Sequence, residues 1–235
     1  MIGIIAAMKI EMENLVADMT DVRTENIGSV VYHCGKLNGT ACVIAMCGVG
    51  KVNAAVCTQT MILTYHPDYI INTGIGGSTS RTTHIGHTVI ADRVVQHDMD
   101  TTALGDELGL LTLSCGNRVY IDTDLTLRQQ LAAVCDKLED ITYTFGTVAT
   151  GDQFICGNEK RTALNEKFGA IVCEMEGGAI GQTCFLNGVP FAILRSISDS
   201  MNEEDDAMEY SRFSQIAAKK SCNIIKAFTA SLIKN

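Results

Sequence analysis

Short runs of β-branched residues alternate with longer amphipathic segments, and this alternation restricts the fold more than any other feature of the chain. Strands are predicted at residues 3–6, 30–34, 41–46, 69–73, 88–95, 143–148, 170–173 and 191–196. Helices are predicted to begin near Ile10, Lys51, Leu125, Glu159, Gly177 and Tyr210. The pattern predicts an α/β fold with a mixed, largely buried central sheet and helices on both of its faces. Between residues 30 and 46 strands follow one another without a helix, which predicts an antiparallel portion.

The chain is predicted to form a single domain over residues 1–235. It is 46% hydrophobic, which suffices for one large core, and two prolines are too few to mark a linker. An acidic run at residues 203–206 is predicted to be a solvated loop. The last helix has the clearest pattern, because Phe213, Ala217, Ile224 and Phe228 mark one face.

Charge and cysteine usage restrict the partners and the compartment. A net charge of −9 argues against nucleic acid or an anionic membrane as a partner, since both require a basic surface. No apolar run reaches the length of a membrane span, and the N-terminus resembles a first strand more than a signal peptide. The ten cysteines form no C-x-x-C pair and lie mostly in apolar runs. Free, buried thiols in a reducing compartment, the cytoplasm, are therefore expected.

Glycines and acids follow several of the predicted strands. Ligands of α/β proteins bind beyond the carboxyl ends of the strands, so these positions are candidates for a site. They hold Glu11, the glycine segments 47–50 and 74–77, Glu174, Glu176 and Asp199. The sequence therefore predicts one site at this edge of the sheet.

The familiar nucleotide and metal motifs do not fit these positions. Neither glycine segment completes G-x-G-x-x-G. Residues 50–51 do not end a phosphate loop, because Ala45 stands where the first glycine is required and Val52 where a hydroxyl would hold magnesium. We therefore interpret the glycines as tight turns where the backbone approaches a ligand or a helix. Segment 97–100 has two aspartates and a histidine but no further His or Cys nearby, which favours a hydrogen-bonded loop over a metal site.

The acids favour a particular chemistry when they are taken together. Singly, Glu11 could be a first-turn residue, Glu174 a salt-bridge partner of Arg195, and Asp199 a helix N-cap. An unpaired carboxylate is costly to bury, so several at one edge indicate a shared task. Cleavage of a glycosidic bond through an oxocarbenium-like transition state uses several acids and needs no metal.

Seven segments carry a resemblance to a known family. In chain order they read GIIAAMKIEME, CGVGKVNAA, INTGIGG, HDMDTTALG, TGDQFICG, IVCEMEGGAI and LRSISD. Together they resemble the successive motifs of bacterial 5′-methylthioadenosine/S-adenosylhomocysteine nucleosidases, which belong to the purine nucleoside phosphorylase superfamily. The resemblance implies a homodimer that hydrolyses a small-molecule nucleoside with water and needs neither metal nor cofactor.

The resemblance implies roles for the acids and their neighbours. Asp199 matches the acid that protonates nitrogen seven of the purine, a role that requires a carboxyl protonated near neutral pH. Ser198 and Arg195 would orient it. Glu11 matches the general base that takes a proton from water. Glu176 matches the carboxylate that accepts hydrogen bonds from the ribose 2′ and 3′ hydroxyls.

Further matches imply contacts to the purine and the sugar. Phe154 falls where the family stacks an aromatic ring on adenine, and the backbone of Ile155 falls where it reads the purine edge. Gly77 and Met175 match further ligand contacts. Glu174 is interpreted as structural support beside the ribose-binding acid.

The 5′ end of the nucleoside is implied to lie in an apolar pocket. Met8, Val49 and Tyr210 match that pocket, and Leu104 matches a residue that reaches in from the other subunit. The sequence departs from the familiar residues at Ile75, Leu104, Thr112 and Tyr210. These departures leave open the preference among methylthioadenosine, S-adenosylhomocysteine, 5′-deoxyadenosine and aminodeoxyfutalosine.

Two alternatives to the hydrolase remain at this stage. A phosphate-dependent nucleoside phosphorylase of the same fold would present arginines to phosphate after the first strand and before the glycines. Here Lys9 is the one cation in those places, and Glu11 would repel the anion. A non-catalytic nucleoside-binding protein is the second alternative, although the joint presence of Glu11, Glu176 and Asp199 speaks against it.

Overall fold

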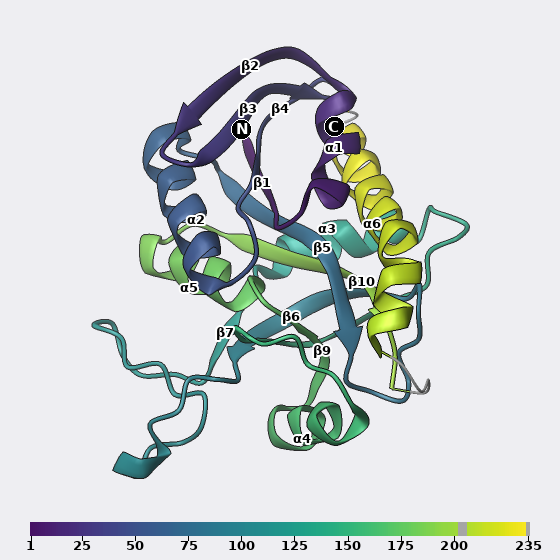
Figure 1. Cartoon of the computed structure of the whole chain (residues 1–235). Coiled ribbons are helices and arrows are strands. Elements are labelled where there is room, and N and C mark those ends of the chain that lie inside the picture. The colour runs from purple at the N-terminus through teal and green to yellow at the C-terminus, as the bar shows by residue number, and fades with distance from the viewer. Residues whose placement is uncertain (202–205, 234–235) are drawn as a thin grey trace.

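A mixed sheet of ten strands forms the centre of the protein (Figure 1). The computed structural model describes residues 1–201 and 206–233, and the statements below concern these residues. The strands are β1 (Ile2–Ala6), β2 (Met19–Ile27), β3 (Val30–Leu37), β4 (Thr40–Met46), β5 (Tyr69–Ser78), β6 (Thr88–Gln96), β7 (Tyr120–Asp122), β8 (Tyr143–Thr150), β9 (Ala170–Glu174) and β10 (Phe191–Asp199). The predicted α/β fold with a mixed central sheet is confirmed.

Part of the sheet closes on itself. Strand β10 pairs with β5 in parallel and with β6 in antiparallel orientation. Strands β6, β8 and β9 pair in parallel, and β9 returns to β5 in antiparallel orientation. Five strands thus form a closed ring, from which β1, β4, β3 and β2 continue as an open sheet. The ring brings the ends of β5, β9 and β10 together.

The antiparallel portion predicted near residues 30–46 is present, because β2, β3 and β4 pair antiparallel in chain order. The sequence pattern did not predict β2 or β7. Strand β2 reads MTDVRTENI and is mostly exposed, so it lacks the apolar alternation of a half-buried strand. Strand β7 has only three residues.

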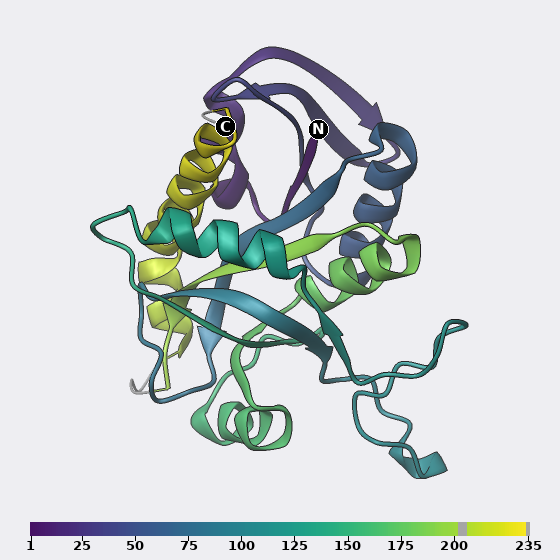
Figure 2. The same ribbon diagram turned by 180° about the vertical axis from the view of Figure 1, so that it is seen from behind.

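Helices cover both faces of the sheet (Figures 1 and 2). They are α1 (Lys9–Ala17), α2 (Lys51–Tyr65), α3 (Leu125–Cys135), α4 (Asn158–Phe168), α5 (Gly177–Asn187) and α6 (Asp206–Ser231). Helices α2 and α5 lie together on one face, while α1, α3 and α6 lie on the other. Met61 and Ile180 belong to the core of the first face, and Leu15, Leu131 and Phe228 to that of the second. No described helix is both long and apolar enough to cross a membrane.

Helix α6 begins at Asp206, before the start predicted near Tyr210. Its predicted apolar face is confirmed, since Ala217, Ile224 and Phe228 are buried. Residues 203–205 of the acidic run, predicted to be a solvated loop, lie outside the described residues.

The second glycine segment is not a turn, which corrects the sequence prediction. Strand β5 continues through residues 74–77 and pairs with β10 as far as Gly77, opposite Asp199. These positions require glycine because there is no room for a side chain. A Cβ on Gly76 would lie 2.6 Å from Val172, and one on Gly77 would lie 2.6 Å from the Asp199 carboxyl. By contrast, Gly50 in the first segment has a φ of +98°, which favours glycine.

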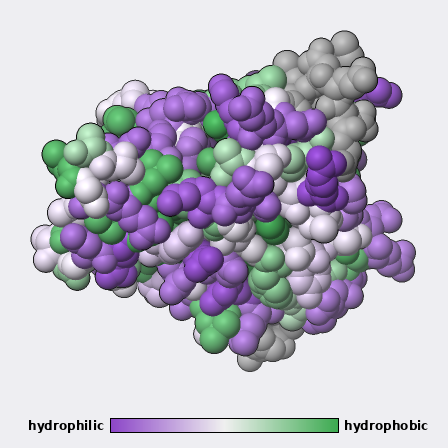
Figure 3. Space-filling view, turned by 90° about the horizontal axis from the view of Figure 1, so that it is seen from below, coloured by the Kyte–Doolittle hydropathy of each residue, from purple (hydrophilic) through white to green (hydrophobic). Residues whose placement is uncertain are grey.

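A long connection between β6 and β7 projects from the body of the protein (Figures 1 and 2). It contains the 3₁₀ turn η1 (Thr102–Leu104) and a bridge between Leu111 and Arg118. The Leu104 side chain is 83% exposed. Seen from below, hydrophobic residues gather on the side from which this connection projects (Figure 3). An exposed apolar cluster of this kind is typical of a contact surface.

Candidate active site

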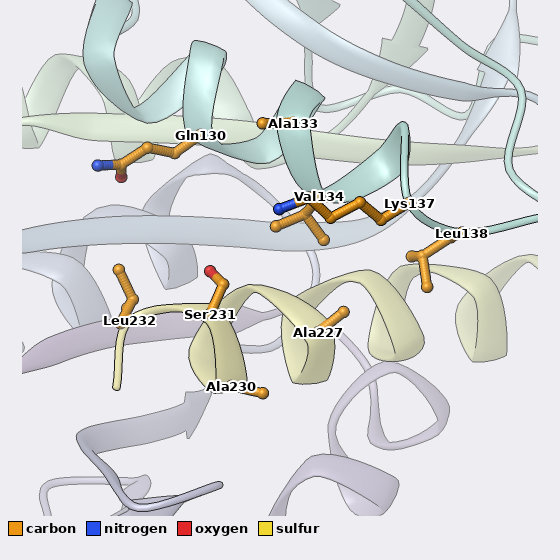
Figure 4. A pocket seen from close by; sticks show the side chains of 9 residues that line it. All are labelled: Gln130, Ala133, Val134, Lys137, Leu138, Ala227, Ala230, Ser231 and Leu232. Atoms are coloured by element: carbon orange, nitrogen blue, oxygen red, sulfur yellow. The ribbon is translucent and has the colours of Figure 1, made fainter. Parts of the chain in front are cut away.

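A groove of about 460 Å³ lies between α3 and α6 (Figure 4). Mainly apolar side chains line it, with Gln130, Lys137 and Ser231 as its polar groups. None of these is a carboxyl, so the groove offers no acid–base pair. Size alone therefore does not mark the candidate active site.

A smaller cavity, of about 90 Å³, lies beyond the ends of β1, β5, β9 and β10. Ten of the predicted site residues line it: Met8, Glu11, Val49, Gly77, Phe154, Met175, Glu176, Ser198, Asp199 and Tyr210. Ile155 lines an adjoining cavity that shares Gly77 and Asp199 with it. The acids predicted at one edge of the sheet thus surround one space.

Glu11 is held rigidly at the start of α1. One carboxyl oxygen accepts hydrogen bonds from the backbone N–H groups of Ala7 and Met8, both at 2.9 Å. The other accepts from the N–H of Ile75 in β5, at 3.0 Å. Burial raises the pKa of Glu11, although Arg195 and these N–H donors oppose the rise. A raised pKa makes a carboxylate a stronger base, which suits proton removal from water.

Asp199 ends β10 at an irregularity of the strand. Ile197 lies opposite Gly76 and Asp199 opposite Gly77, so Ser198 is an extra residue in β10. Such a bulge redirects the neighbouring side chains. The Ser198 hydroxyl donates to one Asp199 carboxyl oxygen at 2.6 Å, as its predicted orienting role requires. The Arg161 guanidinium contacts the other oxygen.

Glu174 and Glu176 occupy different environments although one residue separates them. Strand β9 ends at Glu174, whose carboxylate accepts from the backbone N–H groups of Glu176 and Gly177 at 3.1 and 2.7 Å. Glu176 is the N-cap residue just before α5, and its carboxylate accepts from the N–H of Gly50 at 2.8 Å. Burial and the nearby charge of Glu174 raise the pKa of Glu176 to about 7. Its carboxyl lines the cavity, as a substrate-binding group must.

Arg195 lies behind the cavity and pairs with Glu174, which confirms the salt bridge considered from the sequence. Its guanidinium also contacts the side-chain oxygen of Asn72. The expectation that Arg195 orients Asp199 is not met, because the cation in contact with Asp199 is Arg161. The positive charge of Arg195 acts instead on Glu11 and Glu176. The strand register explains why Arg195 does not contact Asp199. Arg195 lies four residues before Asp199 in β10 and pairs with Gly74 of β5, whereas Asp199 pairs with Gly77.

Two aromatic rings meet at the cavity. Phe154 and Tyr210 pack edge to face with their ring centres 5.4 Å apart. The Tyr210 hydroxyl contacts the sulfur of Met8 at 3.3 Å. Val49 and Met8 complete the apolar lining. Leu104 does not line this cavity, and its predicted role in another subunit stays a prediction.

Arg161 is the site residue that the sequence prediction missed. It lies on α4, is fully buried, and belongs to a polar segment, NEKRTALNEKF, that resembles a surface helix. One signal was available, because Arg161, Leu164 and Phe168 are spaced as one helical face and all three are buried. An arginine on an otherwise apolar face indicates a buried partner.

The arrangement suits acid–base cleavage of a bond held in the cavity. Glu11 and Asp199 come from different elements and both line the space, so one can accept a proton while the other donates one. Glu176 adds an acceptor that could bind hydroxyl groups. Phe154 offers a ring face for a flat heterocycle.

Comparisons with known proteins agree with this geometry. Residues 1–230 match the phosphorylase superfamily. The 5′-methylthioadenosine/S-adenosylhomocysteine nucleosidase of Shewanella loihica is 38% identical over 86% of this chain and 87% of its own. Futalosine hydrolase of Helicobacter pylori has a TM-score of 0.91 at 29% identity, over 98% of this chain and 97% of its own.

A mutant of the Helicobacter pylori 5′-methylthioadenosine/S-adenosylhomocysteine nucleosidase, solved with 5′-methylthioadenosine in its active site, also has a TM-score of 0.91. Its identity is 28%, and the match covers 98% of both chains. The chain therefore belongs to the phosphorylase superfamily and, within it, to the family of 5′-methylthioadenosine/S-adenosylhomocysteine nucleosidases.

Proposed function

We propose that this protein hydrolyses the N-glycosidic bond of 5′-methylthioadenosine and S-adenosylhomocysteine, and of related nucleosides such as 5′-deoxyadenosine. The products are adenine and the corresponding 5-substituted ribose. The observation that carries the proposal is the joint placement of Glu11, Glu176 and Asp199 around one cavity. The family to which the chain belongs supports the same reaction.

Glu11 and Asp199 perform the proton transfers in this proposal. Glu11 takes a proton from water, whose oxygen forms a bond to the anomeric carbon of the ribose. Asp199 gives a proton to nitrogen seven of the purine as the glycosidic bond breaks, so that adenine leaves as a neutral molecule. Ser198, which donates to the Asp199 carboxyl, holds the acid in place.

Glu176 and Met175 hold the sugar. An ionised carboxylate accepts hydrogen bonds from both the 2′ and 3′ hydroxyls, and its charge favours the cationic ring that develops in the transition state. The backbone N–H of Gly50 fixes one Glu176 oxygen and so sets the direction of the other. Met175, which is half-buried and lines the same cavity, packs on the sugar ring.

Phe154, Ile155 and Gly77 bind the base in this proposal. Adenine stacks on the ring of Phe154, the backbone of Ile155 contacts its edge, and Gly77 leaves room for the purine beside Asp199. Because the cavity measures about 90 Å³, and pockets for small ligands measure roughly 300 Å³ or more, the cavity widens when a nucleoside enters. The 5′ substituent then lies against Met8, Val49 and Tyr210.

Hydrolysis fits the site better than phosphorolysis. Lys9, the cation that follows the first strand, has a side chain 80% exposed and pairs with Glu13 at 3.8 Å. Arg195 and Arg161, the buried arginines of the site, are each in contact with a carboxylate. Among the described residues of the site, these arginines already have anionic partners, and phosphate would face Glu11. Water is therefore the nucleophile in this proposal.

A homodimer in the cytoplasm completes the proposal. Leu104 projects on a connection that leaves the body of the chain, as a residue that completes the 5′ pocket of a second copy would (Figure 1). None of the ten cysteines, all of which lie in the described residues, forms a disulfide bond, which suits a reducing compartment.

Incubation of the purified protein with 5′-methylthioadenosine in phosphate-free buffer tests the reaction. We expect free adenine and methylthioribose, detected by chromatography, at a rate that added phosphate does not change. Methylthioribose 1-phosphate as a product, or adenine that appears only with phosphate, would overturn hydrolysis in favour of phosphorolysis. As a control, the Asp199→Asn variant should bind the nucleoside and release at least about 100-fold less adenine, the typical contribution of a general acid.

A further inference from the structure

Arg161 has a set of contacts that a surface helix would not provide. Its guanidinium contacts the Asp199 carboxyl, donates to the carbonyl of Ser78 at 3.0 Å, and donates to the carbonyl of Ile155 at 3.5 Å. These acceptors belong to β10, to β5 and to the connection that follows β8. One side chain of α4 thus joins the proposed acid to the backbone proposed to contact the purine.

The surroundings of the pair fix its geometry. The Ser198 hydroxyl donates to one Asp199 oxygen while Arg161 contacts the other, so the carboxyl is held from both sides. Gly77 leaves the necessary space, since a Cβ there would lie 2.6 Å from the Asp199 oxygen and 3.2 Å from the Arg161 nitrogen. Because the guanidinium is planar and donates in fixed directions, it restrains the orientation of the carboxyl as well as its position.

A purely structural arginine would not need this particular partner. A buried guanidinium requires an anionic partner, yet the carboxylate it contacts here lines the cavity rather than the core. A cation beside a general acid stabilises the negative charge that remains on the carboxyl when its proton leaves. The same cation would have no effect on a leaving group that departs without a proton.

We propose that Arg161 is a positioning residue for the acid step: it holds Asp199 toward the purine and stabilises the carboxylate formed as the proton moves to the base. This proposal rests on the proposed nucleosidase function and adds a residue to it. By donating to the Ile155 carbonyl, Arg161 also fixes the position of the purine-binding connection relative to Asp199. It acts through Asp199 and touches neither the sugar nor the attacking water.

Two substrates separate this role from general damage to the site. In 5′-methylthioadenosine the leaving group needs a proton, whereas the p-nitrophenyl glycoside of 5-methylthioribose releases a stable anion without one. We expect Arg161→Met to lower kcat for adenine release by about 100-fold, the scale of a general acid. We expect p-nitrophenol release to fall by less than about 5-fold, because sugar binding and water activation remain. Arg161→Lys should fall between Arg161→Met and the wild type for adenine release, since it keeps the charge without the planar geometry.

Asp199→Asn and Arg93→Met provide the controls. If Arg161 acts through Asp199, adding Arg161→Met to Asp199→Asn should lower adenine release by less than about 3-fold, because coupled residues are not additive. Arg93, which donates to Thr147 and lies over the ring of Tyr120 away from the cavity, is the matched arginine. Arg93→Met should leave the rates for both substrates within about 3-fold of wild type.

Three results would overturn the role of Arg161: adenine release within about 3-fold of wild type in Arg161→Met, equal losses for both substrates, or full additivity with Asp199→Asn. Thermal unfolding of each variant shows whether it folds. If Arg161→Met does not fold, Arg161→Lys is used instead to compare adenine release with p-nitrophenol release. If the wild type and Arg161→Met release adenine equally well, the positioning role is refuted and the proposed function stands. A wild-type protein that releases no adenine refutes the proposed function, and the role of Arg161 falls with it.

Discussion

Glu174 and Glu176 contribute differently to the protein, although both are buried carboxyls in one short turn. Glu174 has a cation, Arg195, and two backbone N–H donors, so its charge is compensated. Glu176 has one N–H donor and faces the charge of Glu174, which raises its pKa to about 7. The first carboxylate therefore stabilises the fold, whereas the second is kept exposed to the cavity at the expense of stability.

This difference predicts that Glu176→Gln stabilises the protein at alkaline pH. The folded protein binds a proton at Glu176 between pH 4.5 and about 7, whereas the unfolded chain does not, so wild-type stability falls as the pH rises through this range. At pH 8 the variant should be more stable by on the order of 1–3 kcal/mol, and the gain should disappear near pH 4.5. Urea unfolding at both pH values measures it.

Glu174→Gln is the matched control, with the opposite expected sign. It leaves Arg195 buried without its carboxylate, so unfolding free energy should fall by about 3 kcal/mol. Equal and destabilising effects of the two substitutions at pH 8 would contradict the separate environments assigned to these carboxyls.

At the scale of elements, β5 and β10 set the geometry of the acid. Their parallel pairing places Gly77 opposite Asp199, and the bulge at Ser198 turns the acid toward the cavity. The helices contribute differently: α1 presents Glu11 from its first turn, Glu176 is the N-cap residue just before α5, and α4 supplies Arg161 from its buried face. The site therefore depends on strand register more than on any single loop.

Gly77→Ala should disturb the acid more than it disturbs the fold. Its Cβ would meet the Asp199 carboxyl and the Arg161 guanidinium, and displacement of a catalytic group by about 1 Å can lower the rate about 100-fold. Gly146→Ala is the control, because its Cβ would meet the side chain of Ile171, which does not line the cavity. We expect Gly146→Ala to lower the melting temperature and keep kcat, while Gly77→Ala loses kcat. Comparable kcat values for the two variants would contradict the argument.

Elements whose sequence signals lie within the element or next to it could be predicted from the sequence. The structure confirms the helix starts predicted near Lys51, Leu125 and Gly177. The continuation of β5 through its glycines was not predictable in this way, because those glycines are needed for contacts with residues distant in the sequence. Arg161 was missed for the same reason, since its partner Asp199 lies 38 positions away.

At the scale of the whole molecule, the proposed homodimer predicts that each site needs a residue from the other chain. The cavity is lined by elements of the closed ring of strands and their helices, whereas Leu104 projects from that body with its side chain 83% exposed. An apolar residue at the end of a long connection is typical of a surface that a partner covers. In a two-fold dimer each chain would give its Leu104 to the other, so each site would need both chains.

Mixing two impaired variants tests this shared site. Leu104→Ala removes the apolar side chain given to the partner and should lower the rate of adenine release at low substrate concentration about 10-fold. Asp199→Asn disables the acid of its own chain. A mixed dimer contains one site with an intact acid and an intact Leu104 from the Asp199→Asn chain. After random exchange of equal amounts, activity should rise from about one-twentieth to about a quarter of the wild-type value. Activity that stays at the average of the separate variants, although co-purification through an affinity tag on one variant shows mixed dimers, would mean that Leu104 serves no site in the partner.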